Sequence, residues 1–352
     1  GSVFGAVAAV LGQLAKWLIE KEILPRIAGD GSDGTPKVDS FEKLIKSLLG
    51  GKPLEIPPGS SGRLELARWL TRPENPLTAR VMVNRIWQHL FGRGLVASPS
   101  NFGMRGDPPS HPELLDWLAA RFVEGGWSMK AIYRLIATSK TYQLSSDDDE
   151  AGLAKDPADR WCWRHDRRRL DAEALRDAML SVSGLLERGR PGEHPFPRIE
   201  TWGWMQHNPF KAVYPSNHRT VYLMTQRLQK HPFLALFDGP DTNSTTDART
   251  SSIVPQQALF LRNNPFAEEA AAAFARRLTA VPGPAARRIE AACELAFGRP
   301  PEAVEVQEGV AFVDRCAFEL AKAGAPQDRI ELEAWASYAR VLFASNELLF
   351  VD

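Results

Sequence analysis

The sequence has few of the features that mark several large protein classes. It contains three cysteines, Cys162, Cys293 and Cys316, and this small, odd and widely spaced set excludes a disulfide framework. Lysine plus arginine and aspartate plus glutamate both number 43, so no net charge directs the chain towards nucleic acid. No Cys-x-x-Cys-His motif occurs, so we expect no covalently attached haem. We predict no cofactor for this chain.

The common enzyme signatures are also missing. The sequence has no Gly-x-Ser-x-Gly elbow, no His-Glu-x-x-His motif, no Walker loop and no Rossmann glycine fingerprint. These absences exclude several enzyme classes that sequence alone can identify. They do not exclude catalysis by two carboxylates, because such residues can come from distant segments and meet at about 5–10 Å. The candidates are Asp116, Glu173, Asp238 and Asp241, which the sequence alone cannot pair.

The composition is that of an ordinary globular protein, with 44% hydrophobic and 24% charged residues. Apolar residues recur mainly at helical spacing. We therefore predict a mainly α, multi-helix single domain over residues 57–352. Residues 1–56 are predicted to form an N-terminal helical extension: an amphipathic helix, a Gly/Asp/Ser-rich linker and a short helix. The apolar part of the first helix is too short to cross a bilayer, so we expect no transmembrane span.

Helices are predicted near residues 77–91, 111–124, 128–139, 171–187, 254–262, 264–279, 284–297, 301–323 and 327–345. Ser110 and Glu113 have the spacing of a capping box, and Pro112 suits a first helical turn. On the first of these helices Arg80, Asn84 and Gln88 form a polar line, which we interpret as an available face. One core is predicted to contain Trp69, Val83, Ile86, Trp87, Leu115, Trp117 and Leu118.

Four stretches of the sequence carry a family resemblance. They are RLELARWLTRPENPLTARVMVNRIWQHLFGRGLVASPSNFG (from Arg63), HPELLDWLAARFVEGGWSMKAIYRLIATSKTYQ (from His111), RRLDAEALRDAMLSVSGLL (from Arg168) and RTVYLMTQRLQKHPFLALFDGPDTNSTTDARTSSIVPQQALFLRNNPF (from Arg219). Over roughly residues 57–352 the chain resembles the planctomycete-type domain of unknown function fifteen-fifty-three. The resemblance implies the C-terminal part of a large exported protein, periplasmic or extracellular, whose neighbouring domains often include a cytochrome-c-like module. It implies no reaction.

A long irregular, aromatic-rich loop over residues 191–215 directs attention to residues 191–250, because long ordered loops often carry function. Four of the seven histidines lie there, interleaved with aromatic residues. This composition suits a sugar or aromatic ligand, and equally suits a loop anchored on the helical core. The histidine spacings match no compact metal motif, so we predict no metal site. The predicted ligand-binding residues are Trp202, Trp204, His207, Arg219, Asp238, Asp241 and Arg249.

Two charged tracts have competing interpretations. Residues 238–249 concentrate oxygen ligands, but Arg249 stands where an EF-hand loop needs its glutamate, so turns and caps are favoured over calcium. The basic run at residues 164–169 could bind an anion, but nearby acids favour structural ion pairs.

Two functions of different classes remain. The first is a binding or assembly module of an exported multidomain protein that engages neighbouring domains or a glycan. The alternative is a hydrolase or related enzyme that acts on envelope or extracellular polysaccharide through acidic residues and histidines. We expect no nucleic-acid partner.

Overall fold

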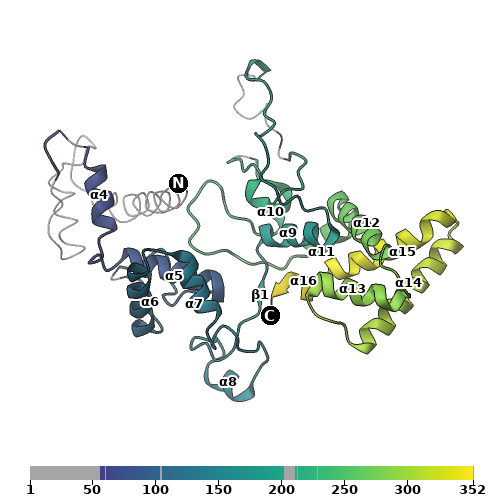
Figure 1. Ribbon diagram of the computed structural model, residues 1–352, viewed down its shortest axis with the longest axis horizontal. Coiled ribbons are helices and arrows are strands. Elements are labelled where there is room, and N and C mark those ends of the chain that lie inside the picture. The colour runs from purple at the N-terminus through teal and green to yellow at the C-terminus, as the bar shows by residue number, and fades with distance from the viewer. Residues whose placement is uncertain are drawn as a thin grey trace. The chain divides into compact units, whose positions relative to one another are not determined.

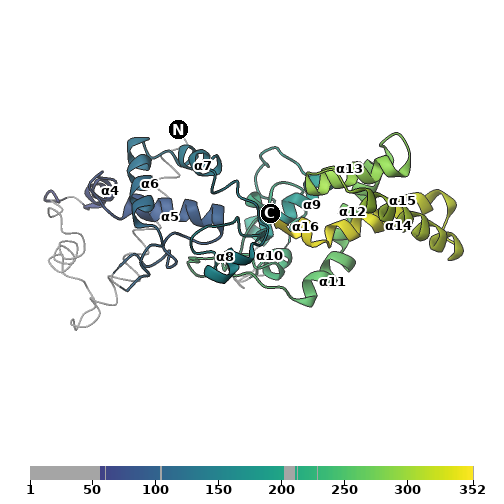
Figure 2. The ribbon, with the colours of Figure 1, turned by 90° about the horizontal axis from the view of Figure 1, so that it is seen from below.

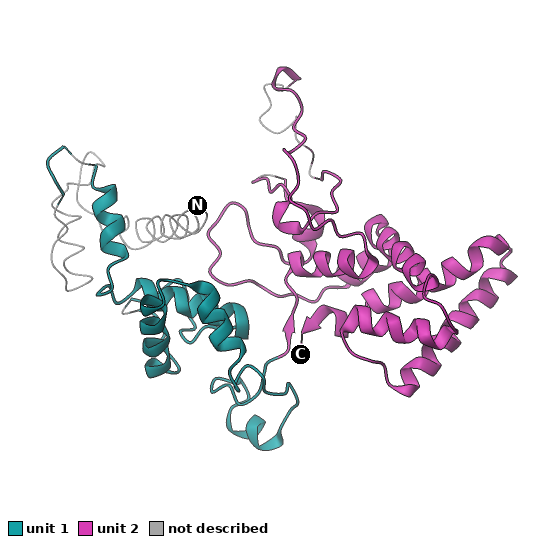
Figure 3. Cartoon of the chain, in the orientation of Figure 1, with its two compact units in different colours: residues 1–166 teal, residues 167–352 magenta. Residues whose placement is uncertain are grey.

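The computed structural model describes residues 56–59, 61–103, 105–201, 211, 213–227 and 229–351. Within these residues the fold is mainly α, as predicted, and the strands form one two-stranded sheet. The chain divides into two compact units, residues 1–166 and 167–352 (Figure 3). The predicted amphipathic helix, linker and short helix of residues 1–55 lie outside the described residues, and the predicted domain boundaries stay predictions.

The first unit is built on three helices that lie side by side, α5 (Thr78–Phe91), α6 (Pro112–Glu124) and α7 (Met129–Ala137) (Figure 1). They follow α4 (Arg63–Leu70) and precede the short α8 (Glu150–Lys155). Apolar residues at helical spacing meet between the three helices and form one buried cluster, which includes Val83, Ile86, Trp87, Leu115, Leu118, Phe122, Ile132 and Ile136. Five of the seven predicted core residues therefore pack together.

The remaining two residues of the predicted core behave differently. Trp69 is buried, but it lies on α4 and is not part of this cluster. Trp117 is 47% exposed, and its ring lies under the guanidinium of Arg121 at 5.4 Å. Helical spacing alone did not identify Trp117 as exposed, because a large apolar side chain off the buried stripe still has the residue type of a core position.

Two further local predictions were wrong. Asn84 is fully buried, because its amide donates to Val96 O at 3.0 Å and accepts from Val96 N at 2.8 Å. The polar line on α5 is therefore not a free face. The capping box does not form either, since His111 is the N-cap residue of α6 and makes no side-chain cap bond. Ser110 Oγ instead lies 2.9 Å from His111 Nδ1.

The second unit contains α9 (Ala172–Ser183), η2 (Ile199–Thr201), η3 (Thr220–Tyr222), α10 (Pro232–Leu236), α11 (Pro255–Asn263), α12 (Pro265–Thr279), α13 (Ala285–Phe297), α14 (Ala303–Lys322), α15 (Gln327–Phe343) and α16 (Asn346–Leu349). In both views α12, α13, α14 and α15 gather into one bundle (Figure 2). The buried alanines Ala270, Ala271 and Ala275 have small side chains, so α12 can pack closely against α15 and α9.

The two ends of the second unit pair with each other. Strand β1 (Arg168–Arg169) runs antiparallel to β2 (Phe350–Val351), and Leu170 N donates to Leu349 O at 2.8 Å. The first residues of this unit are thus bound to its last described ones. Among the described helices, none has both the length and the apolar composition that crossing a membrane requires.

Candidate functional site

A cavity of about 270 Å³ lies within the second unit. Three separate stretches of chain supply its walls: residues 191–195, residues 214–224 and His231. The described lining combines imidazole, phenol, proline and carboxylate groups from Pro191, Gly192, Glu193, His194, Pro195, Tyr214, Pro215, Ser216, His218, Tyr222, Leu223, Met224 and His231. Three of the four histidines of the predicted region therefore come together, although they are far apart in sequence.

Helix α9 holds the second of these stretches in place. Arg176 is only 5% exposed, and its guanidinium donates to Ser216 O, to His218 O and to Thr220 Oγ1. The neighbouring Asp177 accepts from Thr220 N at 2.7 Å and from Thr220 Oγ1 at 2.6 Å. Two consecutive side chains of one helix thus satisfy backbone groups of an irregular segment, which has no ladder of its own to satisfy them.

His218 is fixed by Glu187. Its Nε2 lies 3.1 Å from Glu187 Oε2, and its Nδ1 lies 3.3 Å from Glu187 O. The backbone of Glu187 also donates to Asn217 O at 2.9 Å. Both nitrogens of this imidazole are therefore occupied by protein groups, and His218 is a wall of the cavity more than a free ligand group.

His194 and His231 differ from His218 in this respect. The Nδ1 atom of each is buried and has no hydrogen-bond partner in the described part of the chain. The ring of His194 is held edge-on to Tyr214 with a centroid distance of 4.5 Å. A buried polar atom without a partner costs about 1–3 kcal/mol, so a bound polar group at these two nitrogens would be stabilising.

The environment of His231 keeps it neutral. Burial lowers the pKa of its imidazole below the ordinary value of 6.5, and the charge of Arg176 lowers this pKa further. His231 is also the N-cap residue of α10, where it makes no side-chain cap bond. At neutral pH it therefore presents one imidazole nitrogen that can donate and one that can accept.

The seven residues predicted for ligand binding fall into two groups. Trp202, Trp204 and His207 lie outside the described residues. The other four, Arg219, Asp238, Asp241 and Arg249, do not line this cavity. Arg219 comes closest in sequence, directly after His218, and its Nε lies 3.8 Å from Asp177 Oδ2. Ligand binding by these residues stays a prediction.

The oxygen-rich tract at residues 238–249 forms turns and ion pairs. Asp241 Oδ1 accepts from Asn243 N at 3.1 Å, which is an Asx-turn, and Lys230 Nζ lies 3.3 Å away. Asp238 accepts from the backbone and hydroxyl of Ser252 at 2.7 and 2.8 Å. The described residues contain no group of three or more histidine, cysteine or acidic side chains that could hold a metal ion.

Glu173 and Asp116, the remaining carboxylate candidates, are each bound to an arginine. Arg249 contacts both oxygens of Glu173, at 3.0 and 3.1 Å. Asp116 lies 2.5 Å from Arg80 Nε, and this contact lowers the pKa of the Asp116 carboxyl. The catalytic pair considered from the sequence is therefore not assembled by these contacts.

The basic run at residues 164–169 also makes protein contacts. Arg164 pairs with Asp148 and with Asp166, and its guanidinium lies over the Trp163 ring. Arg169 donates to Ser252 O and, at 2.9 Å, to Gln257 Oε1. Arg164 and Arg169 therefore bind groups of the protein itself, which is the structural role that the sequence favoured over an anion site.

A second cavity, of about 190 Å³, lies in the first unit. Its lining includes Arg93, Asp107, Asp159 and Cys162. Burial, together with Asp159 and other nearby acids, raises the pKa of the Cys162 thiol to about 11. A thiol that stays protonated at neutral pH is a poor nucleophile, so this cavity offers no thiol chemistry.

The cavity lies partly within residues 191–250, but several residues that form or support it were not named from the sequence. Glu193, Tyr222 and Met224 line the cavity, and Arg176 supports its wall from α9. The available signal for Arg176 was its position on the apolar stripe of a predicted helix, beside Leu175 and Met179. An arginine at such a position must either reach solvent or find buried acceptors.

Comparison with known proteins places the chain by sequence alone. A family model described as "PSD1: Protein of unknown function (DUF1553)" matches residues 62–313. Neither the curated proteins nor the solved structures gave a match.

Proposed function

This chain belongs to the DUF1553 family of unknown function, and from that premise we propose that it is a glycan-binding module of a larger exported protein. The exported setting, periplasmic or extracellular, and the neighbouring domains as partners are parts of the same proposal. They rest on the family resemblance.

One observation carries the glycan part of the proposal: His194 and His231, each with a buried, unpartnered Nδ1, line a cavity with aromatic walls. Sugar hydroxyls both donate and accept hydrogen bonds, so they can satisfy either tautomer of a neutral histidine. The rings of Tyr214 and Tyr222 and the adjacent prolines supply apolar surface for the carbon face of a sugar.

The size of the cavity favours a small occupant. Its volume of about 270 Å³ lies just below the roughly 300–1,000 Å³ of sites for drug-sized ligands. The proposal therefore places one sugar ring of a longer chain in the cavity and leaves the rest of the glycan outside it.

The test is glycan binding by calorimetry with an oligosaccharide panel, using wild type, His194→Gln and His231→Gln. Each substitution removes an imidazole that lines the cavity, so we expect affinity to fall by about tenfold, which is about 1.4 kcal/mol. His89→Gln, which changes an exposed histidine on α5, is the matched control and should bind as wild type does. Absence of glycan binding by the wild type, or unchanged binding by both cavity variants, would contradict the proposal.

The hydrolase alternative rests on a separate observation. His231 has a lowered pKa and could act as a general base, and Glu193 lines the same cavity. The discriminating measurement is release of new reducing ends from polysaccharide. Turnover by the wild type that is lost in both Glu193→Gln and His231→Gln would establish the enzyme, whereas binding without turnover supports the module.

A further inference from the structure

The cavity wall contains a buried positive charge that no carboxylate contacts directly. Arg176 donates to two backbone carbonyls and one hydroxyl, and the described residues include no ion pair for it. Arg249 and Arg299 of this unit differ, since they bind Glu173 and Glu305, whereas Arg169, like Arg176, donates to neutral acceptors. A buried guanidinium that has only neutral acceptors leaves its positive charge partly uncompensated.

The stretch of chain that includes part of this wall also carries positive charge. Between Lys211 and His231 the chain contains four basic residues, Lys211, Arg219, Arg227 and Lys230, and no acidic residue. Lys230 pairs with Asp241, and Arg219 lies 3.8 Å from Asp177. For Lys211 and Arg227 the described part of the chain offers no carboxylate partner.

The negative groups near the cavity offset this charge only in part. Glu193 is the one carboxylate among the described lining residues. Glu187 contacts His218, and Asp177, which accepts from Thr220, also acts electrostatically on Arg176. The field of Arg176 reaches the cavity, because it contributes to the lowered pKa of the lining residue His231.

We infer that the sugar ring bound in this cavity is anionic, carrying a carboxylate, as in a uronic acid, or a sulfate ester. This inference rests on the proposed glycan-binding function. The imidazole nitrogens of His194 and His231 would donate to the oxygens of the acidic group, and Arg176 would supply charge without direct contact, because its donors already bind the wall. A neutral sugar would satisfy the histidines but would leave the charge of Arg176 compensated only by Asp177, which does not contact it directly.

The experiment compares matched acidic and neutral ligands on the intact chain. The probes are tetragalacturonate and its methyl ester, and a sulfated galactan tetrasaccharide and its desulfated form. At least one acidic member should bind about tenfold more tightly than its neutral counterpart, or about 1.4 kcal/mol. The pair with the larger difference in affinity shows whether a carboxylate or a sulfate is the group recognised. Raising the salt concentration should weaken binding of the acidic member more than that of the neutral one.

Glu193→Gln is the informative variant, because Glu193 is exposed and its removal leaves the contacts of Arg176 in place. Relative to wild type, it should raise the affinity for the acidic probe over that for the neutral probe by about threefold. Arg176→Lys keeps the charge but changes the wall, and its melting temperature separates loss of folding from loss of binding. Equal binding of acidic and neutral probes would overturn the inference and leave the proposed function standing. Binding of no probe by the folded wild type would overturn both.

Discussion

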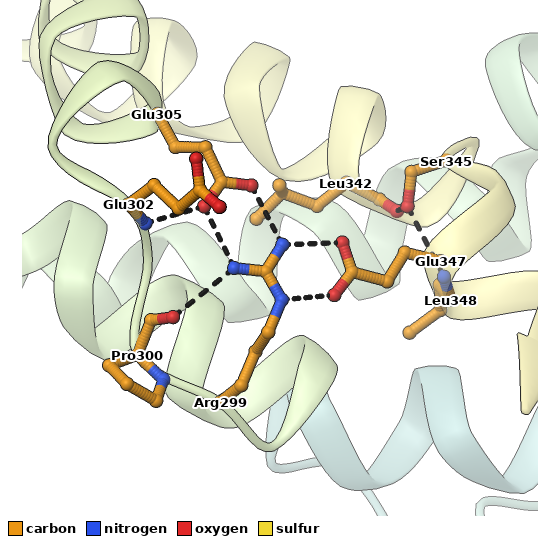
Figure 4. A network of polar contacts seen from close by, with 8 residues as sticks. All are labelled: Arg299, Pro300, Glu302, Glu305, Leu342, Ser345, Glu347 and Leu348. Carbon is orange, nitrogen blue, oxygen red and sulfur yellow. Dashed lines mark hydrogen bonds and ion pairs between the residues drawn. The ribbon is translucent and has the colours of Figure 1, made fainter. Parts of the chain in front are cut away.

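Single residues show how strongly this protein uses arginine to join segments that are distant in sequence. Arg299 lies between two carboxylates, with Glu305 bound at 2.7 and 2.8 Å and Glu347 at 2.5 and 2.8 Å (Figure 4). Glu305 also accepts from Glu302 N and so completes a capping box at the start of α14. One guanidinium thereby connects the loop before α14 to α16 near the end of the chain.

This network should make stability depend on pH in acid. The Arg299 guanidinium lowers the pKa of the Glu305 carboxyl from 4.5 to about 2, so the folded state gives up this proton more readily than the unfolded chain. The resulting stability is present above pH 4.5 and is lost as pH falls towards 2. Because the pair is partly exposed, we expect about 1 kcal/mol or less.

Urea unfolding of wild type and Glu305→Gln at several pH values measures this contribution. The variant should be less stable above pH 4.5, and the difference should shrink as pH falls towards 2. Glu308→Gln, at an exposed position of the same helix, is the control. A difference between wild type and Glu305→Gln that does not change with pH would rule out this explanation.

His231 should produce a pH dependence in a different range. Burial and Arg176 lower the pKa of its imidazole below 6.5, so below that pH the unfolded chain binds a proton that the folded state resists. Stability should therefore fall as pH drops below 6.5, and His231→Gln should remove part of this decline. Thermal unfolding from pH 8 to pH 5 tests this, and identical pH profiles for the two proteins would count against it.

At the scale of elements, α5 is fastened to the loop that follows it through Asn84. A Cβ added at Gly94 would lie 2.6 Å from Asn84 Nδ2 and 2.6 Å from Val96 O, so this approach requires glycine. Asn84→Ala leaves both backbone groups of Val96 buried without their partner. We expect a loss of about 2–4 kcal/mol in the free energy of unfolding.

Gly94→Ala should be destabilising for a related reason, because the added methyl displaces the same amide. The two substitutions act on one contact, so their effects should be less than additive in a double-mutant cycle. His89→Ala, at an exposed position of α5, controls for helix substitution. Full additivity would mean that Asn84 and Gly94 act independently.

At the scale of the whole molecule, the two compact units have separate cores. Leu118 belongs to the α5–α7 cluster, and Leu278 belongs to the cluster of the second unit. Each is almost fully buried, so Leu118→Ala and Leu278→Ala should each cost about 2–5 kcal/mol. We expect calorimetry to resolve two transitions, with each variant lowering one of them.

Comparing Leu118→Ala with Leu278→Ala tests whether the two units unfold cooperatively. If one transition moved equally in both variants, the two units would unfold together in spite of their separate cores. If each variant moved its own transition, the stability of the second unit, and of its cavity, could be changed without altering the first.

The sequence by itself determined the helices. Nine predicted ranges correspond to observed helices, because apolar periodicity, glycine at the ends and proline in first turns are properties of neighbouring residues. It gave no range for α4, of 8 residues, and missed the shorter α8, α10 and α16, whose lengths of 6, 5 and 4 residues hold too few positions to show a period. It also identified the family, which a match over residues 62–313 confirms.

Only the tertiary structure decided which polar residues lie inside. Asn84 and Arg176 have the residue types of surface positions, yet both are buried, because each satisfies backbone groups of a segment that sequence patterns cannot place beside it. The cavity has the same origin, since His194, His218 and His231 come from separate stretches of chain, and contacts with α9 and Glu187 hold the stretch that contains His218. Periodicity acts between near neighbours, whereas a site assembled from three segments depends on long-range contacts that no local pattern encodes.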